Sequence, residues 1–276
     1  MGAVTDKVQL VKEESARIAE YLRKLTPAAW ETQSACDAWQ VRDVLAHFTL
    51  SMDMFGACIA RGAAGDAAPP DGSSLAGEGD QAARLAANAQ RAVTLREELG
   101  EGLLAAYNER RVQFDEVLAG LSDGDKDKPC YHPAGTISVE TYLNLRLTEL
   151  IVHEWDIRSV LEAEPVLSSE SLPSIVEMFP VFVVGRLFDP GNGMPASSRF
   201  RFETTGGAAG SYDIVAGGGE KARMETASHL RPDVILGCDT QTFVLLVYGR
   251  MTLEEATAAG KIVASGNNDL VAQFGS

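Results

Sequence analysis

The most informative stretch of the chain is SVETYLNLRLTELIVHEWDIRSVL, residues 138–161. Its spacing predicts a helix that begins after Ser138 as the capping residue. On that helix Glu149 and His153 are four residues apart, so their side chains project from the same face, one turn from each other. A carboxylate and an imidazole placed in this way can bind one metal ion together. The stretch therefore predicts a helix that carries a pair of metal ligands.

The predicted helix has one polar stripe between apolar neighbours. The stripe consists of Arg146, Glu149, His153 and Asp156. A helix that is apolar on both flanks is surrounded by protein, so its ionisable stripe should face a cavity or a partner, where charges need pairing or a metal. The alternative is an exposed stripe in which Arg146 pairs with Glu149 and His153 pairs with Asp156. The spacing alone fits both interpretations.

A third candidate ligand lies far upstream. His47, in AWQVRDVLAHF, falls on another predicted helix. If it meets Glu149 and His153, the three form a His/His/Glu site with an open coordination position, the form typical of a catalytic metal. Taken alone, His47 also fits a hydrogen-bonded core histidine. The other two histidines, His132 and His229, fall in predicted loops.

Hydrophobic periodicity predicts a helical amino-terminal half. The long helices are expected over residues 6–25, 41–61, 94–121 and 138–161. A Gly/Ala/Pro/Ser-rich loop at 62–79 and a short helix at 81–91 precede the third of them, which a capping box from Thr94 to Glu97 should open. Four long helices joined by loops predict an antiparallel bundle.

The pattern changes after Pro165. One more helix, over residues 171–188, is expected to kink or split at Pro180. Strands are predicted at 199–204, 212–215, 222–225 and 233–237, separated by glycine-rich turns. Helices, a further strand and a last helix near Leu270 complete the pattern. The fold class is therefore multidomain, with a helical domain over residues 1–165 and a small α+β domain over 166–276, the boundary lying between 165 and 190.

Composition and charge exclude several classes of function. Hydrophobic residues make up 45% of the chain and charged residues 23%, as in a globular protein. The net charge of −15 argues against a nucleic-acid partner or an anionic membrane surface. No apolar stretch is long enough to span a bilayer, and no signal peptide is recognisable, so we expect a cytoplasmic protein. The 4 cysteines lack a CxxC pair, which indicates reduced thiols and disfavours a zinc–thiolate site.

Two motifs and the carboxy-terminal stretch resemble a known family. W-x-x-R-D-x-L-A-H-F at residues 39–48 and E-x-x-x-H-x-x-D at 149–156 are similar to the DinB-like four-helix bundle of mycothiol-dependent maleylpyruvate isomerases. YGRMTLEEATAAGKIVASGNNDLVAQF resembles the end of a sterol-carrier-protein-like α+β domain, which accompanies that bundle in the family. The resemblance covers essentially the whole chain, in the right order.

The resemblance implies a metal-dependent enzyme. It implies a divalent metal, usually zinc, bound by His47, Glu149 and His153, with the remaining positions for water or the thiol of mycothiol or another low-molecular-weight cofactor. In the isomerase reaction the thiolate adds to the conjugated double bond of maleylpyruvate, and rotation followed by elimination gives the trans isomer. The same thiolate could open an epoxide or displace a leaving group, as in a thiol S-transferase.

The resemblance also implies two supporting residues. The family places an arginine of the second domain near the metal, suited to a substrate carboxylate, and Arg250 matches that position best. Asp156 is expected to accept the hydrogen bond of a metal-bound histidine, although an ion pair with Arg158 or another surface cation fits the spacing equally well.

The expected partner is a small-molecule substrate, with neither nucleic acid nor membrane, in a monomer or homodimer. A function of a different class also fits the sequence. The carboxy-terminal domain alone could make the protein a non-enzymatic binder or carrier of an apolar small molecule. That alternative predicts a large apolar cavity within residues 190–276 and no dependence on His47.

Overall fold

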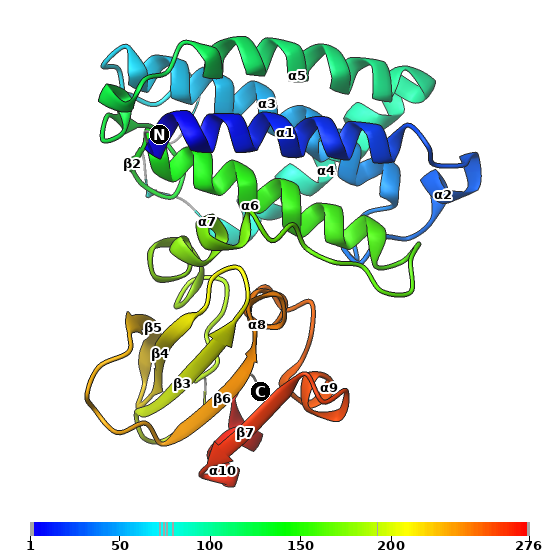
Figure 1. The fold of residues 1–276 in the computed structure, drawn as a ribbon. Coiled ribbons are helices and arrows are strands. Elements are labelled where there is room, and N and C mark those ends of the chain that lie inside the picture. The colour runs from blue at the N-terminus through cyan, green and yellow to red at the C-terminus, as the bar shows by residue number, and fades with distance from the viewer. Residues whose placement is uncertain are drawn as a thin grey trace. The chain divides into compact units, whose positions relative to one another are not determined.

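The structure is a computed structural model that describes residues 3–274 apart from 72, 74, 76, 79 and 192. Four residues of the predicted loop at 62–79 therefore lie outside the described residues. The chain divides into two compact units, Met1–Pro165 and Val166–Ser276. The first is helical and the second contains a sheet (Figure 1), which confirms the predicted combination of α and α+β regions.

The first unit is built from helices that pack pairwise. They are α1 (Ala3–Leu22), α2 (Pro27–Glu31), α3 (Val41–Ala63), α4 (Gln81–Leu99), α5 (Leu103–Ala119) and α6 (Val139–Arg158), with two short paired strands, β1 (Pro129–Cys130) and β2 (Ile137–Ser138), before α6. Helix α1 packs against α5 and α6, and α3 packs against α4, α5 and α6 (Figure 1). The helix that carries His47 and the helix that carries Glu149 and His153 are thus direct neighbours.

Helix α6 lies deep in the first unit. Ser138 caps it, because its Oγ accepts a hydrogen bond from the Thr141 backbone nitrogen at 3.1 Å. Most of its side chains are buried, and Arg146 and Asp156 have no exposed surface. The polar stripe is therefore not an exposed row. Of the two ion pairs in that interpretation, His153–Asp156 is present at 2.8 Å, and no Arg146–Glu149 pair is found among the described side chains.

The predicted helix start at Thr94 is also wrong. Helix α4 continues through this position to Leu99, and the Thr94 hydroxyl donates to the Gln90 carbonyl inside the helix at 3.1 Å. The break comes later, at Gly100–Gly102, where Gly100 has a φ of 50°. Only glycine adopts that left-handed conformation without strain, so the glycines end α4 and α5 begins after them.

The second unit holds a five-stranded sheet in the order β5-β4-β3-β6-β7. Its elements are α7 (Leu172–Glu177), β3 (Ser198–Thr205), β4 (Gly210–Gly217), β5 (Glu220–Thr226), β6 (Val234–Asp239), α8 (Thr240–Val247), α9 (Leu253–Ala258), β7 (Ile262–Gly266) and α10 (Asn268–Gln273). Strands β3 and β6 are parallel and the other pairs are antiparallel. The predicted strands are confirmed. The predicted split of the helix at Pro180 is also confirmed, since α7 is followed by a separate π-helical turn over Phe179–Val183.

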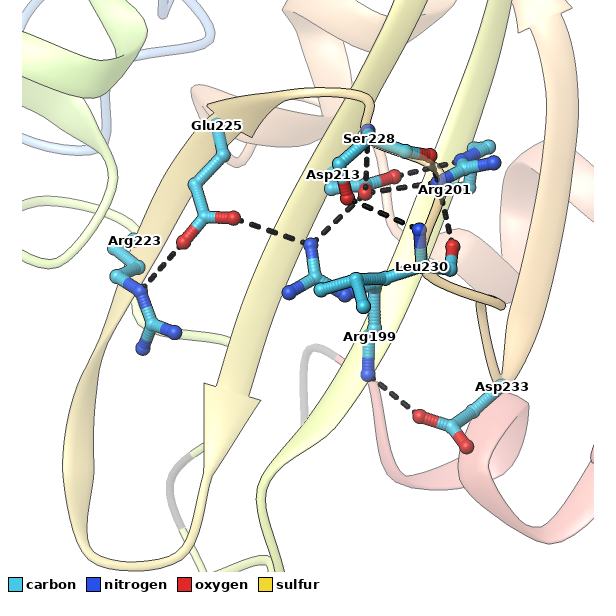
Figure 2. A network of polar contacts seen from close by, with 8 residues as sticks. All are labelled: Arg199, Arg201, Asp213, Arg223, Glu225, Ser228, Leu230 and Asp233. Atoms are coloured by element: carbon cyan, nitrogen blue, oxygen red, sulfur yellow. Dashed lines mark hydrogen bonds and ion pairs between the residues drawn. The ribbon is translucent and has the colours of Figure 1, made fainter.

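The two faces of this sheet differ in chemistry. On one face Phe202 stacks on Phe243 of α8 with ring centroids 4.5 Å apart, and Phe200 lies 4.5 Å from Phe274. The other face carries a network of charged side chains from β3, β4 and β5 (Figure 2). The sheet is therefore held by an aromatic core on one side and by ion pairs on the other.

Asp213 is the centre of the network in Figure 2. Its fully buried carboxylate accepts hydrogen bonds from Arg201 Nε at 2.7 Å and Arg199 Nη1 at 2.9 Å. Arg201 also donates to the carbonyl oxygens of Ser228 and Leu230, which fastens the loop after β5 to the sheet. Burial opposes ionisation of Asp213, but these arginines outweigh it and lower the pKa of the carboxyl. The network ties loop and sheet together.

In the part of the chain that the structure describes, no helix is both long enough and apolar enough to cross a membrane.

Candidate metal centre

Three predicted ligands meet between α3 and α6. His47 Nε2 lies 2.7 Å from Glu149 Oε2, and His153 Nε2 lies 3.6 Å from the same oxygen. All three ligand atoms lie within 4.8 Å of one another. Ligand atoms on a tetrahedral zinc with bonds of about 2.0–2.1 Å are about 3.3 Å apart, so small side-chain movements would bring this set around one ion. Two imidazoles and a carboxylate are also a donor set that suits zinc.

The three side chains are recessed but accessible. His47 keeps 16% of its side-chain surface exposed, Glu149 25% and His153 15%. The three residues are thus neither fully exposed nor sealed. A set of three protein ligands leaves a tetrahedral metal one further position, as in catalytic rather than closed structural sites.

The protonation states favour metal binding at two of the ligands. Burial opposes ionisation of Glu149, but the hydrogen bond with His47 and the charges of His153 and Arg146 lower its pKa to about 2. Burial also lowers the pKa of His47, and Glu149 offsets this only in part. At neutral pH the site thus offers a carboxylate and a neutral imidazole, the forms that bind metals.

His153 differs, because its other ring nitrogen is held by a carboxylate. Its Nδ1 lies 2.8 Å from Oδ2 of Asp156. Burial opposes the charged ring, but the hydrogen bonds with Asp156 and Cys36 raise the pKa of His153 to about 10. A metal must displace a proton from Nε2, and the carboxylate meanwhile fixes the orientation of the ring. Arg158, the alternative partner considered for Asp156, pairs with Glu154 and Glu162.

Arg146 lies one turn before Glu149 on α6 and has no exposed surface. Its Nη1 donates to Ser51 Oγ at 2.8 Å, and its guanidinium lies over the ring of Phe114. Among the described side chains it forms no ion pair with Glu149, and its Nε and Nη2 have no hydrogen-bond partner. Burial lowers its pKa. A buried cation with unused donors is costly, so this region is not arranged for stability alone.

Two residues that were not among the candidates from the sequence, Trp39 and Cys36, also contact this site. Trp39 stacks on His47 with ring centroids 4.8 Å apart, and its indole nitrogen donates to the Ala89 carbonyl at 3.2 Å. Cys36 donates from Sγ to Asp156 Oδ2 at 2.9 Å. Trp39 opens the motif at residues 39–48 that contains His47, so the sequence did offer a signal for it. Cys36 has no ligand-like spacing to any other candidate, so nothing in the sequence pointed to it.

Arg250, the arginine matched to the substrate carboxylate, belongs to the second unit. It follows α8, and its Nη1 donates to the Tyr248 carbonyl at 2.9 Å. Its catalytic role remains a prediction.

Each unit also contains a cavity away from these ligands. A cavity of about 400 Å³ in the first unit is lined by Trp30, Leu45 and Leu103, with Arg42 and Arg96 among its charged residues. The cavity in the second unit has a volume of about 470 Å³. Its lining includes Pro173, Val176, Pro180, Tyr212 and Met224. Both volumes fall in the range of small-molecule sites.

Comparison with known proteins assigns the family. The family model described as "Mycothiol maleylpyruvate isomerase N-terminal domain" matches residues 11–158, the region that contains every candidate ligand. The chain belongs to the mycothiol maleylpyruvate isomerase family. The predicted family, which is one of enzymes, is thereby confirmed.

Solved structures support the same fold over nearly the whole chain. Crystal structures of the mycothiol-dependent maleylpyruvate isomerase and of a single-histidine mutant of it each match with a TM-score of 0.60 and 12% sequence identity. Each match covers 95% of this chain and 92% of the solved chain. At this identity the likeness shows a shared fold. A search of curated proteins finds no match.

Proposed function

We propose that this chain is a metal-dependent enzyme that activates a low-molecular-weight thiol, such as mycothiol, for attack on a small electrophilic substrate. The observation that carries the proposal is the convergence of His47, Glu149 and His153 within the region that matches the family. We assign the first unit as a DinB-like four-helix bundle and the second as a sterol-carrier-like domain. The proposed metal is divalent, with zinc favoured by the two imidazoles and the carboxylate.

A bound zinc ion would lower the pKa of a thiol and so supply a thiolate at neutral pH. The chain itself supplies the arrangement. Glu149 contributes a negative charge to the ligand set, Asp156 holds His153 through Nδ1, and Trp39 packs on the ring of His47. Rigid ligands on two packed helices keep the remaining position open to the thiol and the substrate.

A thiol bound there would supply a nucleophilic sulfur. For isomerisation it would add reversibly to a conjugated cis double bond, with the π electrons moving onto the conjugated carbonyl, so that rotation and reversal would return the thiolate and the trans isomer. For S-transfer the new carbon–sulfur bond would be kept and the leaving group would depart with the electron pair. Arg250 is proposed to bind a substrate carboxylate in either reaction.

The test combines elemental analysis of protein purified without chelator with turnover assays using mycothiol, glutathione and bacillithiol. The proposal predicts one divalent metal per chain and turnover that requires a thiol. His153→Ala should lose both, whereas His229→Ala, which changes an exposed histidine of the second unit, should keep both. Wild-type protein without metal, or turnover that survives His153→Ala, would contradict the proposal.

The cavity of about 470 Å³ in the second unit supports one other function, a binder of a partly apolar small molecule, since Val176 and Met224 line it beside Glu177 and other polar residues. Mass spectrometry of gently purified protein would test it. A co-purifying apolar compound that remains bound in His47→Ala would support this function, and its absence would count against it.

A further inference from the structure

The loop between α2 and α3, residues 33–40, reaches both histidines of the proposed centre. It closes on itself through an antiparallel bridge between Gln33 and Gln40. The side-chain amide of Gln33 fills the loop and donates to the carbonyl oxygens of Cys36 at 2.9 Å and Trp39 at 2.7 Å. The two residues that contact the histidines are therefore set on one internally braced segment.

The same loop is fastened to α6 at the residue that holds His153. The Ala35 backbone nitrogen donates to the Asp156 backbone oxygen at 3.0 Å. Beside this contact, Cys36 Sγ donates to Asp156 Oδ2 at 2.9 Å, and the same oxygen lies 2.8 Å from His153 Nδ1. Cys36 Sγ is itself 3.6 Å from Nδ1. One oxygen of a fully buried carboxylate thus serves both the thiol and the ring.

We propose that Cys36 is a positioning residue of the metal centre, acting through Asp156 to fix the ring plane of His153. This inference rests on the proposed function. The side-chain torsion that turns an aspartate carboxylate has a broad energy well, so the groups bonded to the carboxylate decide its orientation. Two groups in contact with one buried oxygen restrict that orientation. The ring follows, and its Nε2 then faces Glu149.

Cys36 could instead be a metal ligand, since its sulfur lies near His153 Nδ1 and Asp156. Asp156 has no exposed surface, whereas His47, Glu149 and His153 are all partly exposed. Cys36 is partly exposed as well. Burial alone does not separate the two roles. The two roles predict different spectra, which makes them separable.

The first experiment measures zinc affinity by competition with a chelating dye in Cys36→Ala, Cys36→Ser and Cys58→Ala. Cys58 is the matched control, a buried thiol of α3. Cys36→Ala should weaken zinc binding about 10-fold, the low end of the range for groups that support a metal ligand. Cys36→Ser keeps a donor and should recover most of the loss, and Cys58→Ala should change nothing. Unchanged affinity in a folded Cys36→Ala protein would overturn the inference.

The second experiment loads the same proteins with cobalt(II) and records their absorption spectra. The positioning role predicts no sulfur-to-cobalt charge-transfer band in the protein alone, and visible bands that shift in Cys36→Ala. A charge-transfer band that disappears in Cys36→Ala would make the thiol a ligand and overturn the inference.

A double-mutant cycle with Asp156→Asn tests whether Cys36 acts on His153 through Asp156. Cys36→Ala should cost little further affinity once Asp156 is changed, whereas additive losses would contradict action through Asp156. Wild-type protein that binds no metal would refute the proposed function. Wild-type protein that binds metal beside an unaffected Cys36→Ala would refute only the role of Cys36.

Discussion

Each unit contains a cluster of ionisable side chains, and the two clusters are built in opposite ways. In the second unit, the Asp213 carboxylate accepts hydrogen bonds from Arg199 and Arg201. Arg201 also donates to the Ser228 carbonyl, so the charges are paired within the network (Figure 2). In the first unit, the ligand atoms of His47 and His153 both face one oxygen of Glu149. A network of mutually paired charges stabilises its fold, whereas ligand atoms that converge on one point can bind an ion.

The largest effect should come from removing one ligand from the candidate metal centre of the first unit. Glu149→Ala takes away the only carboxylate among the three ligands. We expect metal affinity to fall by more than the roughly 100-fold that marks the upper range for supporting groups, and thiol-dependent turnover to fall with it. Isothermal titration with zinc measures the first effect and a turnover assay the second. A Glu149→Ala protein that still binds zinc tightly would remove the contrast between the clusters.

The next largest effect should come from removing the central carboxylate of the Asp213 network in the second unit. Asp213→Ala leaves Arg199 and Arg201, whose side chains are only 13% and 17% exposed, without their shared carboxylate. The second unit should lose about 1–3 kcal/mol of unfolding free energy, measured by urea denaturation, with no change in metal content. Glu203→Ala, at an exposed position of β3, is the control and should cost little. A metal loss in Asp213→Ala would show that the cluster is not purely structural.

A smaller effect should appear on acidification. Because the folded protein lowers the pKa of Asp213 below the unfolded value of about 3.9, its stabilisation is complete above that value and is lost as pH falls through the folded pKa. Urea midpoints measured from about pH 6 to about pH 3 should therefore fall more steeply in wild-type protein than in Asp213→Asn. Equal slopes would mean that the carboxylate does not titrate with folding.

The smallest effect should come from changing Trp39, which packs beside the candidate metal centre. Trp39→Leu removes the ring stacked on His47 and the hydrogen bond to Ala89. An aromatic contact of this kind is worth about 0.5–1.5 kcal/mol, so zinc affinity should fall about 2- to 10-fold. Trp30→Leu, which changes a tryptophan of α2, should leave zinc affinity unchanged. Equal losses in both variants would point to general destabilisation.

Local patterns made much of this structure predictable. The periodicity of residues 138–161 identified α6 and placed Glu149 and His153 on one face, because four residues make about one helical turn. Alternation and glycine-rich turns identified the strands of the second unit.

Features that depend on tertiary packing could not be predicted from the sequence. The T-x-x-E sequence at Thr94 is also compatible with a helix interior, where the threonine hydroxyl donates to the carbonyl one turn earlier, so it misplaced the start of α5. The contact of Cys36 with Asp156 joins residues 120 positions apart, and no spacing rule spans such a distance. The pairing of Arg199 and Arg201 with Asp213 depends on the register of β3 and β4, which alternation alone does not specify.

X-ray absorption at the zinc edge, before and after addition of mycothiol, tests the proposed centre most directly. Before addition, zinc should have only nitrogen and oxygen ligands at about 2.0–2.2 Å, including two imidazoles. After addition, one sulfur should appear at about 2.3 Å. Sulfur present before addition, or none after it, would contradict a centre formed by His47, Glu149 and His153 that keeps one position for a thiol.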